Sequence, residues 1–175
     1  MAEPVTLEEA KYQCRMEDDD SDDTFITSLI APARALVERR SRRLFVGGER
    51  TETFNRWGDH LEIWRSPITS VDTIEYGSDG TGTAYTDFQA NLGGFPLRIS
   101  AGTEGFPELA DGETVTVTYT AGELSATSEE YLIGKRAILL LIGFWYDNRG
   151  EVPLSKEMKL AFDELLGELG PAPVY

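Results

Sequence analysis

The feature that most constrains the fold of this chain is an apolar run near its carboxyl end, AILLLIGFWY, at residues 137–146. Helical character extends around it, from Ser128 to about Asn148, and charged residues flank it closely on both sides. Because the run is apolar all round a helix, it must be buried on every side. Its ten residues fall well short of the roughly twenty that cross a bilayer. The run therefore predicts a helix at the centre of a bundle, or one that packs against a neighbouring subunit.

Three further helices are predicted from capping patterns and apolar spacing. Thr6-Leu7-Glu8-Glu9 has the form of a capping box and predicts a short helix to about Arg15. A second helix begins near Thr24 and carries apolar residues at helical spacing. Pro32 lies inside it and removes one backbone hydrogen bond, so we expect a kink there. A fourth helix is expected after Pro153.

The acidic stretch MEDDDSDDTF, residues 16–25, raises the question of a cation site. A calcium loop starting at Asp18 would need a glycine and, later, a bidentate glutamate where this sequence has Asp23 and Leu29. We therefore expect no metal here. The stretch instead predicts that Asp22 or Asp23 caps the second helix, and that the other acids favour the positive end of that helix.

The pattern between residues 46 and 121 is that of strands and turns. Residues 114–119 alternate strictly, so Val115, Val117 and Tyr119 should share one face of a strand. Five more strands are predicted between glycine-containing turns, at residues 51–57, 61–64, 72–76, 85–92 and 97–100.

The predicted fold class is therefore α+β, a bundle of about four helices with an inserted small antiparallel β-domain. The expected boundaries are residues 1–45 and 122–170 for the helical domain, 46–121 for the β-domain and 171–175 for an extended tail.

Composition excludes several classes of protein. The formal net charge is -15, which opposes broad binding to duplex DNA because such binding depends on Lys and Arg displacing phosphate counterions. Cys14 is the one cysteine, so the chain has no internal disulfide and no Cys/His cluster for zinc. The first residues lack the basic and apolar regions of a signal peptide, and we expect a soluble cytosolic protein.

No catalytic constellation is visible in the sequence. His60 is the only histidine and lies in a turn, where an ordinary surface role is favoured. Residues 77–82 are rich in glycine but lack the lysine of a phosphate-binding loop, so a hairpin turn is predicted. The 31 acidic residues leave a carboxylate-based hydrolase open, although none of them stands out as a pair. We predict no catalytic, metal or cofactor site, and a bacterial enzyme or binding module with a β-rich insert remains the alternative.

The apolar helix and the segregated charges point instead to an assembly component, and here the sequence resembles a known family. VTLEEAK at residues 5–11, FITSLI at 25–30 and the arginines that follow resemble the opening of head–tail connector (adaptor) proteins of tailed bacteriophages and gene-transfer-agent-like particles. SPITSV at residues 66–71, VTYTAG at 117–122 and the close of the third helix resemble later parts of the same pattern.

The resemblance covers roughly residues 5 to 150 and implies a structural virion protein. It implies a homo-oligomeric ring, usually of twelve copies, in the neck below the portal, where it extends the DNA channel and provides the tail attachment site. The implied partners are further copies, the portal protein and the next neck (stopper) or tail protein, with assembly in the host cytoplasm. DNA would pass without specific binding, which an acidic channel favours because it repels phosphates. The resemblance implies no membrane, cofactor or catalysis.

Three groups of residues are predicted to make contacts with other subunits. The subunit interface is expected on the third helix, at Leu139, Leu140, Ile142, Phe144 and Trp145. Contacts with an acidic partner are expected from the end of the second helix, at Arg39, Arg40, Arg42 and Arg43. The tail from Gly167 is expected to become ordered only against the portal, through Val174 and Tyr175. A solvated helix end and a frayed terminus are the alternatives for the last two groups.

Overall fold

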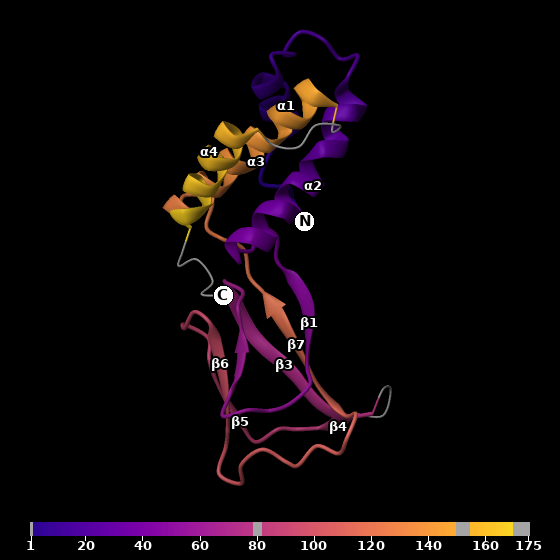
Figure 1. Ribbon diagram of the computed structural model, residues 1–175, viewed down its shortest axis with the longest axis vertical. Helices are drawn as coiled ribbons and strands as arrows, with labels where there is room; N and C mark the ends of the chain where they lie inside the picture. The colour runs from indigo at the N-terminus through magenta and orange to yellow at the C-terminus, as the bar shows by residue number, and fades with distance from the viewer. Residues whose placement is uncertain (1, 79–81, 150–154, 170–175) are drawn as a thin grey trace. The chain divides into compact units, whose positions relative to one another are not determined.

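The computed structural model describes residues 2–78, 82–149 and 155–169 of the chain (Figure 1). The chain divides into two compact units. One, the helical unit, combines Met1–Val46 with Leu124–Tyr175, and the other, the β-unit, is Gly47–Glu123. Helices and antiparallel strands are both present, so the predicted mixed α+β class is confirmed.

The helical unit contains four helices, α1 (Leu7–Cys14), α2 (Asp23–Ser41), α3 (Glu129–Asn148) and α4 (Lys156–Gly167). The capping box before α1 is confirmed, since Thr6 accepts a hydrogen bond from the Glu9 amide and the Glu9 carboxylate accepts one from the Thr6 amide. Serine side chains cap two of the other helices: Ser128 accepts a hydrogen bond from the Tyr131 amide at the start of α3, and Ser155 accepts one from the Met158 amide at the start of α4. Pro32 lies within α2 and does not end it.

Helix α3 is buried by helices of its own chain. It contacts α1, α2 and α4, and Ala137, Ile138 and Leu141 are completely buried. The ring of Phe45 lies directly against Gly134, where a larger residue would overlap it. Among the described residues, no helix is long and apolar enough to cross a membrane. The helical unit therefore buries much of the apolar run, whereas Leu139, Leu140, Phe144 and Trp145 stay partly exposed.

The aspartates before α2 do not cap it as predicted. Asp22 is the N-cap residue, but its side chain makes no capping hydrogen bond. Its carboxylate instead accepts a hydrogen bond from the Tyr146 hydroxyl at 2.7 Å and lies 3.3 Å from the Arg149 guanidinium. Asp23 pairs with Lys11 at 2.8 Å. The capping prediction is wrong because the carboxylates find partners on α1 and α3, which the local sequence does not reveal.

The start of the predicted tail also needs correction. Gly167 is the last residue of α4, and Glu168 caps its end through a backbone hydrogen bond to Glu164. Leu169 is 1% exposed and belongs to the core of the helical unit. These residues pack with the domain because Leu169, two residues beyond the helix, places an apolar side chain in the core. Residues 170–175 lie outside the described part of the chain.

The β-unit contains seven strands in two antiparallel sheets. The strands are β1 (Gly48–Phe54), β2 (Leu61–Ile63), β3 (Ile68–Gly77), β4 (Thr83–Ala84), β5 (Phe88–Asn91), β6 (Leu97–Ala101) and β7 (Thr114–Ala121). One sheet has the order β1-β7-β3-β4 and the other the order β2-β6-β5.

Strand β7 organises the core of this unit. Val115, Val117 and Tyr119 are buried and alternate with half-buried threonines, so the predicted common face is confirmed. Trp57 adds an aromatic cluster, with its ring stacked on Phe106 at 4.6 Å between centroids. Both rings also contact Tyr85. The stacking fixes the long connection between β6 and β7 against the core.

Candidate functional site

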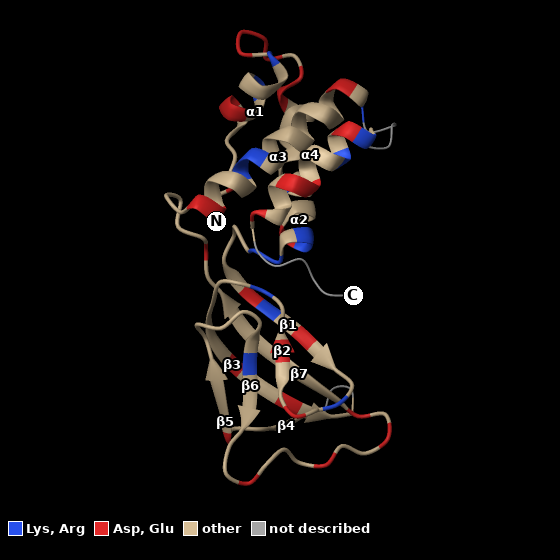
Figure 2. Ribbon diagram, turned by 60° about the vertical axis from the view of Figure 1, so that its left-hand side comes forward, with Lys and Arg blue, Asp and Glu red and all other residues tan. Residues whose placement is uncertain are grey.

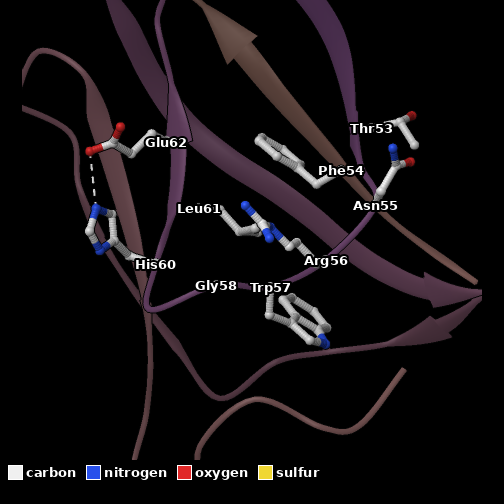
Figure 3. Close-up of a pocket in the computed structure, with 9 residues that line it drawn as sticks. All are labelled: Thr53, Phe54, Asn55, Arg56, Trp57, Gly58, His60, Leu61 and Glu62. Atoms are coloured by element: carbon white, nitrogen blue, oxygen red, sulfur yellow. Dashed lines mark hydrogen bonds and ion pairs between the residues drawn. The ribbon is translucent and has the colours of Figure 1, made fainter. Parts of the chain in front are cut away.

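A hollow of about 760 Å³ in the β-unit follows the connection from β1 to β2 (Figure 3). Its lining includes Arg56, His60 and Glu62, and the Trp57 ring lies at its edge. The hollow places the single histidine of the chain beside a carboxylate, which makes it the candidate for a catalytic site.

His60 is held by hydrogen bonding rather than poised for catalysis. Its Nε2 lies 3.0 Å from Oε1 of Glu62, and the same oxygen accepts a hydrogen bond from Nε of Arg98 at 3.0 Å. The hydrogen bond from His60, and then that from Arg98, lowers the pKa of Glu62 below its ordinary value. A carboxylate stabilised in this way is a poor general acid at neutral pH.

The hollow offers no partner for that carboxylate. Glu62 is the one acidic residue among the described residues that line it, whereas glycoside hydrolysis needs two facing carboxyl groups. No serine or cysteine lines it either. Across the described residues, no group of three or more His, Cys, Asp or Glu side chains is placed to hold a metal ion.

The residues predicted for a subunit interface divide into three groups in the structure. Ile142 is fully buried in the helical unit, so it has no surface for a neighbour and this part of the prediction is wrong. Leu139, Leu140 and Trp145 are partly buried and pack against the core of their own unit. Phe144 is partly buried and lies outside that core cluster. Three neighbouring helices, which the sequence pattern could not place, account for the burial.

The four arginines at the end of α2 also divide. The Arg40 guanidinium pairs with Asp163 at 2.9 Å and lies 5.8 Å from the centre of the Phe162 ring. Nε of Arg43 donates to the Leu169 carbonyl at 2.8 Å. These two arginines therefore hold α4 onto α2. Arg39 is exposed and Arg42 half-buried, and within the described residues neither side chain has an acidic partner. Val174 and Tyr175 lie outside the described residues.

A buried carboxylate beside these arginines was not predicted from the sequence. Glu38 is 6% exposed, and its Oε1 accepts hydrogen bonds from the amides of Phe45 and Val46 at 2.8 and 3.3 Å. Its Oε2 lies 2.9 Å from Arg34. The side chain thus fixes the turn that leaves α2. A lone glutamate among four arginines was the available signal, but only the fold shows that its partners are backbone amides.

Lysine 11 is a second missed element of the helical unit. It is buried, and its ammonium group lies between the carboxylates of Asp20 and Asp23. Hydrogen bonds to these two groups, Asp20 first, raise the pKa of Lys11 well above its ordinary value. The acidic stretch is therefore neutralised in part by the chain itself.

The two units differ in charge, as Figure 2 shows. The β-unit carries 13 acidic residues and four arginines, whereas the helical unit carries 18 acidic and 12 basic residues. The connection from β6 to β7, residues 102–113, holds four acids and no lysine, arginine or histidine. Most of the uncompensated negative charge of the chain therefore belongs to the β-unit.

Comparison with known proteins gives two kinds of match. Residues 4–62 match the family model for Phage gp6-like head-tail connector protein. The resemblance to head–tail connector proteins is thereby confirmed for this part of the chain. No curated protein sequence matches the chain.

Solved structures match the fold over nearly the whole chain. A chain from the neck of an empty gene transfer agent (GTA) particle, with C6 symmetry, is 19% identical with a TM-score of 0.74, covering 100% of this chain and 95% of that one. A chain from the virion of a native GTA particle is 21% identical with a TM-score of 0.71, covering 98% and 92%. A chain from the neck of a native GTA particle with C12 symmetry is 20% identical with a TM-score of 0.66, covering 98% and 95%. At these identities the likeness establishes the fold.

Proposed function

We propose that this chain is a structural head–tail connector, an adaptor in the neck of a tailed phage or a GTA-like particle. The proposal depends on two similarities found in the same chain, one in sequence and one in fold. Residues 4–62 match a connector family model, and the complete fold is similar to chains from GTA necks. The hollow beside His60 gives no support to a carboxylate-based hydrolase, because its lining has one carboxylate and no serine or cysteine.

The proposed architecture is a helical bundle with an inserted antiparallel β-domain, repeated in a closed ring of twelve copies. A closed ring joins each copy to its neighbours through two different surfaces. C6 and C12 symmetry in the solved necks that share this fold supports such an assembly. The ring would sit below the portal protein, meet the next neck or tail protein on its other side, and assemble in the host cytoplasm before it enters the virion.

The proposed ring extends the DNA channel without binding DNA specifically. The formal net charge of -15 per copy makes the ring strongly acidic, and acidic walls repel phosphates. Non-specific DNA affinity depends on the displacement of counterions by Lys and Arg, and many of those residues are already paired with acids within the helical unit. The genome could therefore slide through without sticking.

The proposed contact residues are those that the structure leaves at least partly accessible. On α3 they are Leu139, Leu140, Phe144 and Trp145, for contact with a neighbouring copy. At the end of α2 they are Arg39 and Arg42, for contact with an acidic partner. Val174 and Tyr175 complete the proposal as portal contacts.

Electron microscopy of assembled particles tests the proposed function. Particles that contain this chain should show it as a ring of twelve copies between the portal and the tail. Deletion of the gene should give filled or empty heads without attached tails. Normal tailed and infectious particles from the deletion strain would contradict the proposal.

Charge reversal tests the proposed role of the arginines. Replacement of Arg39 and Arg42 with glutamate is expected to reduce attachment of the chain to portal-bearing heads at least tenfold while leaving its circular dichroism spectrum unchanged. Lys156 and Lys159, exposed on α4, provide the matched control when both are replaced with glutamate. If both double variants attach to portal-bearing heads equally well, the arginines at the end of α2 contact solvent and not an acidic partner.

A further inference from the structure

The outer face of the three-stranded sheet β2-β6-β5 has a composition unlike the rest of the β-unit. Leu61, Ile63, Leu97 and Ile99 point into the core and are at most 1% exposed, so the residues that alternate with them point outward. We call this outward set the Trp64 face, and it comprises Glu62, Trp64, Gln89, Asn91, Arg98 and Ser100.

Strand register brings these side chains together. Glu62 lies opposite Arg98, and Arg98 lies opposite Asn91, which makes one row across all three strands. Ser100 lies opposite Gln89 in the next row. Directly opposite residues on one face are about 5 Å apart at Cβ, so the face is a continuous surface rather than a scatter of exposed groups. It is also rigid, since it is carried on paired strands.

Large apolar groups are exposed at the end of this sheet where β2 and β5 stop. Trp64 is 38% exposed, although its ring also packs edge-on against Phe95 at 5.9 Å between centroids. Leu92, which directly follows Asn91 of β5, is 44% exposed. Tryptophan and arginine are the residues most enriched at energetic centres of protein interfaces. An exposed tryptophan beside an arginine on a rigid sheet is therefore typical of a docking surface.

The Trp64 face is also the part of the β-unit that can approach another acidic surface. Its charges balance, because Arg98 and Glu62 are paired at 3.0 Å. The outer face of the four-stranded sheet carries Glu49, Asp72 and Glu75, and the connection at residues 102–113 carries four acids. Opposing like charges across an interface costs several kcal/mol. Two copies that each carry a net charge of -15 repel each other least where the surfaces that meet are close to neutral.

We propose that the Trp64 face is the surface through which the β-unit of one copy docks against a second copy of this chain in the ring. Trp64 and Leu92, exposed at one end of the sheet, supply the apolar contact. The exposed pair of Arg98 with Glu62 and the amides of Gln89 and Asn91 supply polar contacts at the rim. This inference rests on the proposed ring, but it adds an interface on the β-unit to the one expected on α3.

Substitution in the full-length chain gives the first test. Trp64→Ser and Arg98→Glu should each raise the concentration needed for ring formation at least tenfold, as measured by sedimentation velocity and negative-stain imaging. Leu160→Ser on α4 and Arg56→Glu in the β1–β2 connection are matched controls that remove an exposed leucine and reverse an exposed arginine elsewhere. Circular dichroism checks that all four variants fold. Rings that form equally well from all variants overturn the inference and leave the proposed function standing.

Photo-crosslinking in cells that produce the whole particle gives the second test. A photoreactive phenylalanine analogue at Gln89 should yield dimers of this chain, whereas the same group at Thr51, on the outer face of the other sheet, should not. A crosslink from Gln89 to a different protein, or none, overturns the inference. If the wild-type chain forms no closed oligomer in solution or in these cells, the proposed function itself fails.

Discussion

The helical unit and the β-unit use charge in different ways. In the helical unit, ion pairs join segments far apart in the sequence, such as Arg40 with Asp163 and Arg149 with Asp22. The β-unit also has an ion pair between strands, that of Arg98 with Glu62, but its four arginines cannot offset its 13 acids. The net charge of the chain is therefore not spread evenly. Ion pairs stabilise the helical unit, whereas repulsion between unpaired acids destabilises the folded β-unit.

The two units also differ in how their cores are specified. The β-unit is one continuous segment, and strict alternation in β7 determines its buried face. The helical unit is assembled from both ends of the chain, and α3 must find α1 and α2 across the inserted segment. Four predictions test this comparison.

The largest effects are expected from paired cavity substitutions. Ile99→Ala should lower the free energy of unfolding of the β-unit by about 2–5 kcal/mol, because it removes fully buried methyl and methylene groups and leaves a cavity. Ile138→Ala should do the same to the helical unit. Amide hydrogen exchange resolves the two units, and each variant should lose protection mainly in its own. Equal loss in both units from either variant would mean that they unfold as one.

A smaller effect is expected where α3 passes Phe45. Gly134→Ala places a Cβ within the volume of the Phe45 ring, which costs about 1–3 kcal/mol, offset by about 1 kcal/mol of better helix propensity. The net result should be a lower melting temperature. Gly167→Ala is the matched control, since nothing lies within 4 Å of its new Cβ, and it should be neutral or slightly stabilising. A stabilised Gly134→Ala variant would show that the ring moves aside freely.

Lys11→Met should lower the melting temperature of the helical unit, because it leaves the carboxylates of Asp20 and Asp23 facing each other without their shared cation. The folded state raises the pKa of Lys11. The contribution of Lys11 to the free energy of unfolding is therefore complete below the pKa of lysine in the unfolded chain, about 10.4. It is lost as the pH rises from there toward the higher pKa of the folded state. The difference in melting temperature between the wild type and the variant should stay constant from pH 7 to about pH 10 and begin to narrow by about pH 11. Lys159→Met, at an exposed position on α4, serves as the control.

The smallest and most diagnostic effect is that of salt. Sodium chloride screens exposed ion pairs that are each worth about 0.2–1 kcal/mol, so it should slightly weaken the helical unit. In the β-unit it screens net repulsion and should slightly stabilise the fold. Hydrogen exchange of both units between 0.05 and 0.5 M salt measures the two slopes. Slopes of the same sign would contradict the contrast in charge use.

Much of the secondary structure follows from local patterns. The Thr6 capping box, the alternation through Val115 and Val117, and the apolar spacing of α3 each predicted an element that the structure contains. These signals succeed because hydrogen bonds within one turn, or side chains two residues apart, are set by the backbone itself. The candidate contact residues were harder to predict. Ile142 and Arg40 are residue types expected at an interface. In the structure Ile142 is buried in the core of its own unit and Arg40 pairs with Asp163 of the same unit.

The sequence by itself determined the order of elements, the acidity and the resemblance of residues 5 to 150 to connector proteins. Only the tertiary structure decided which charged and apolar groups remain available to partners. Asp22 binds Tyr146 instead of capping α2, and Glu38 holds the amides of Phe45 and Val46. Trp64 stands on the surface while Trp57 is buried. The physical reason is that availability depends on neighbours distant in sequence, because a side chain is free only if the fold brings it no partner.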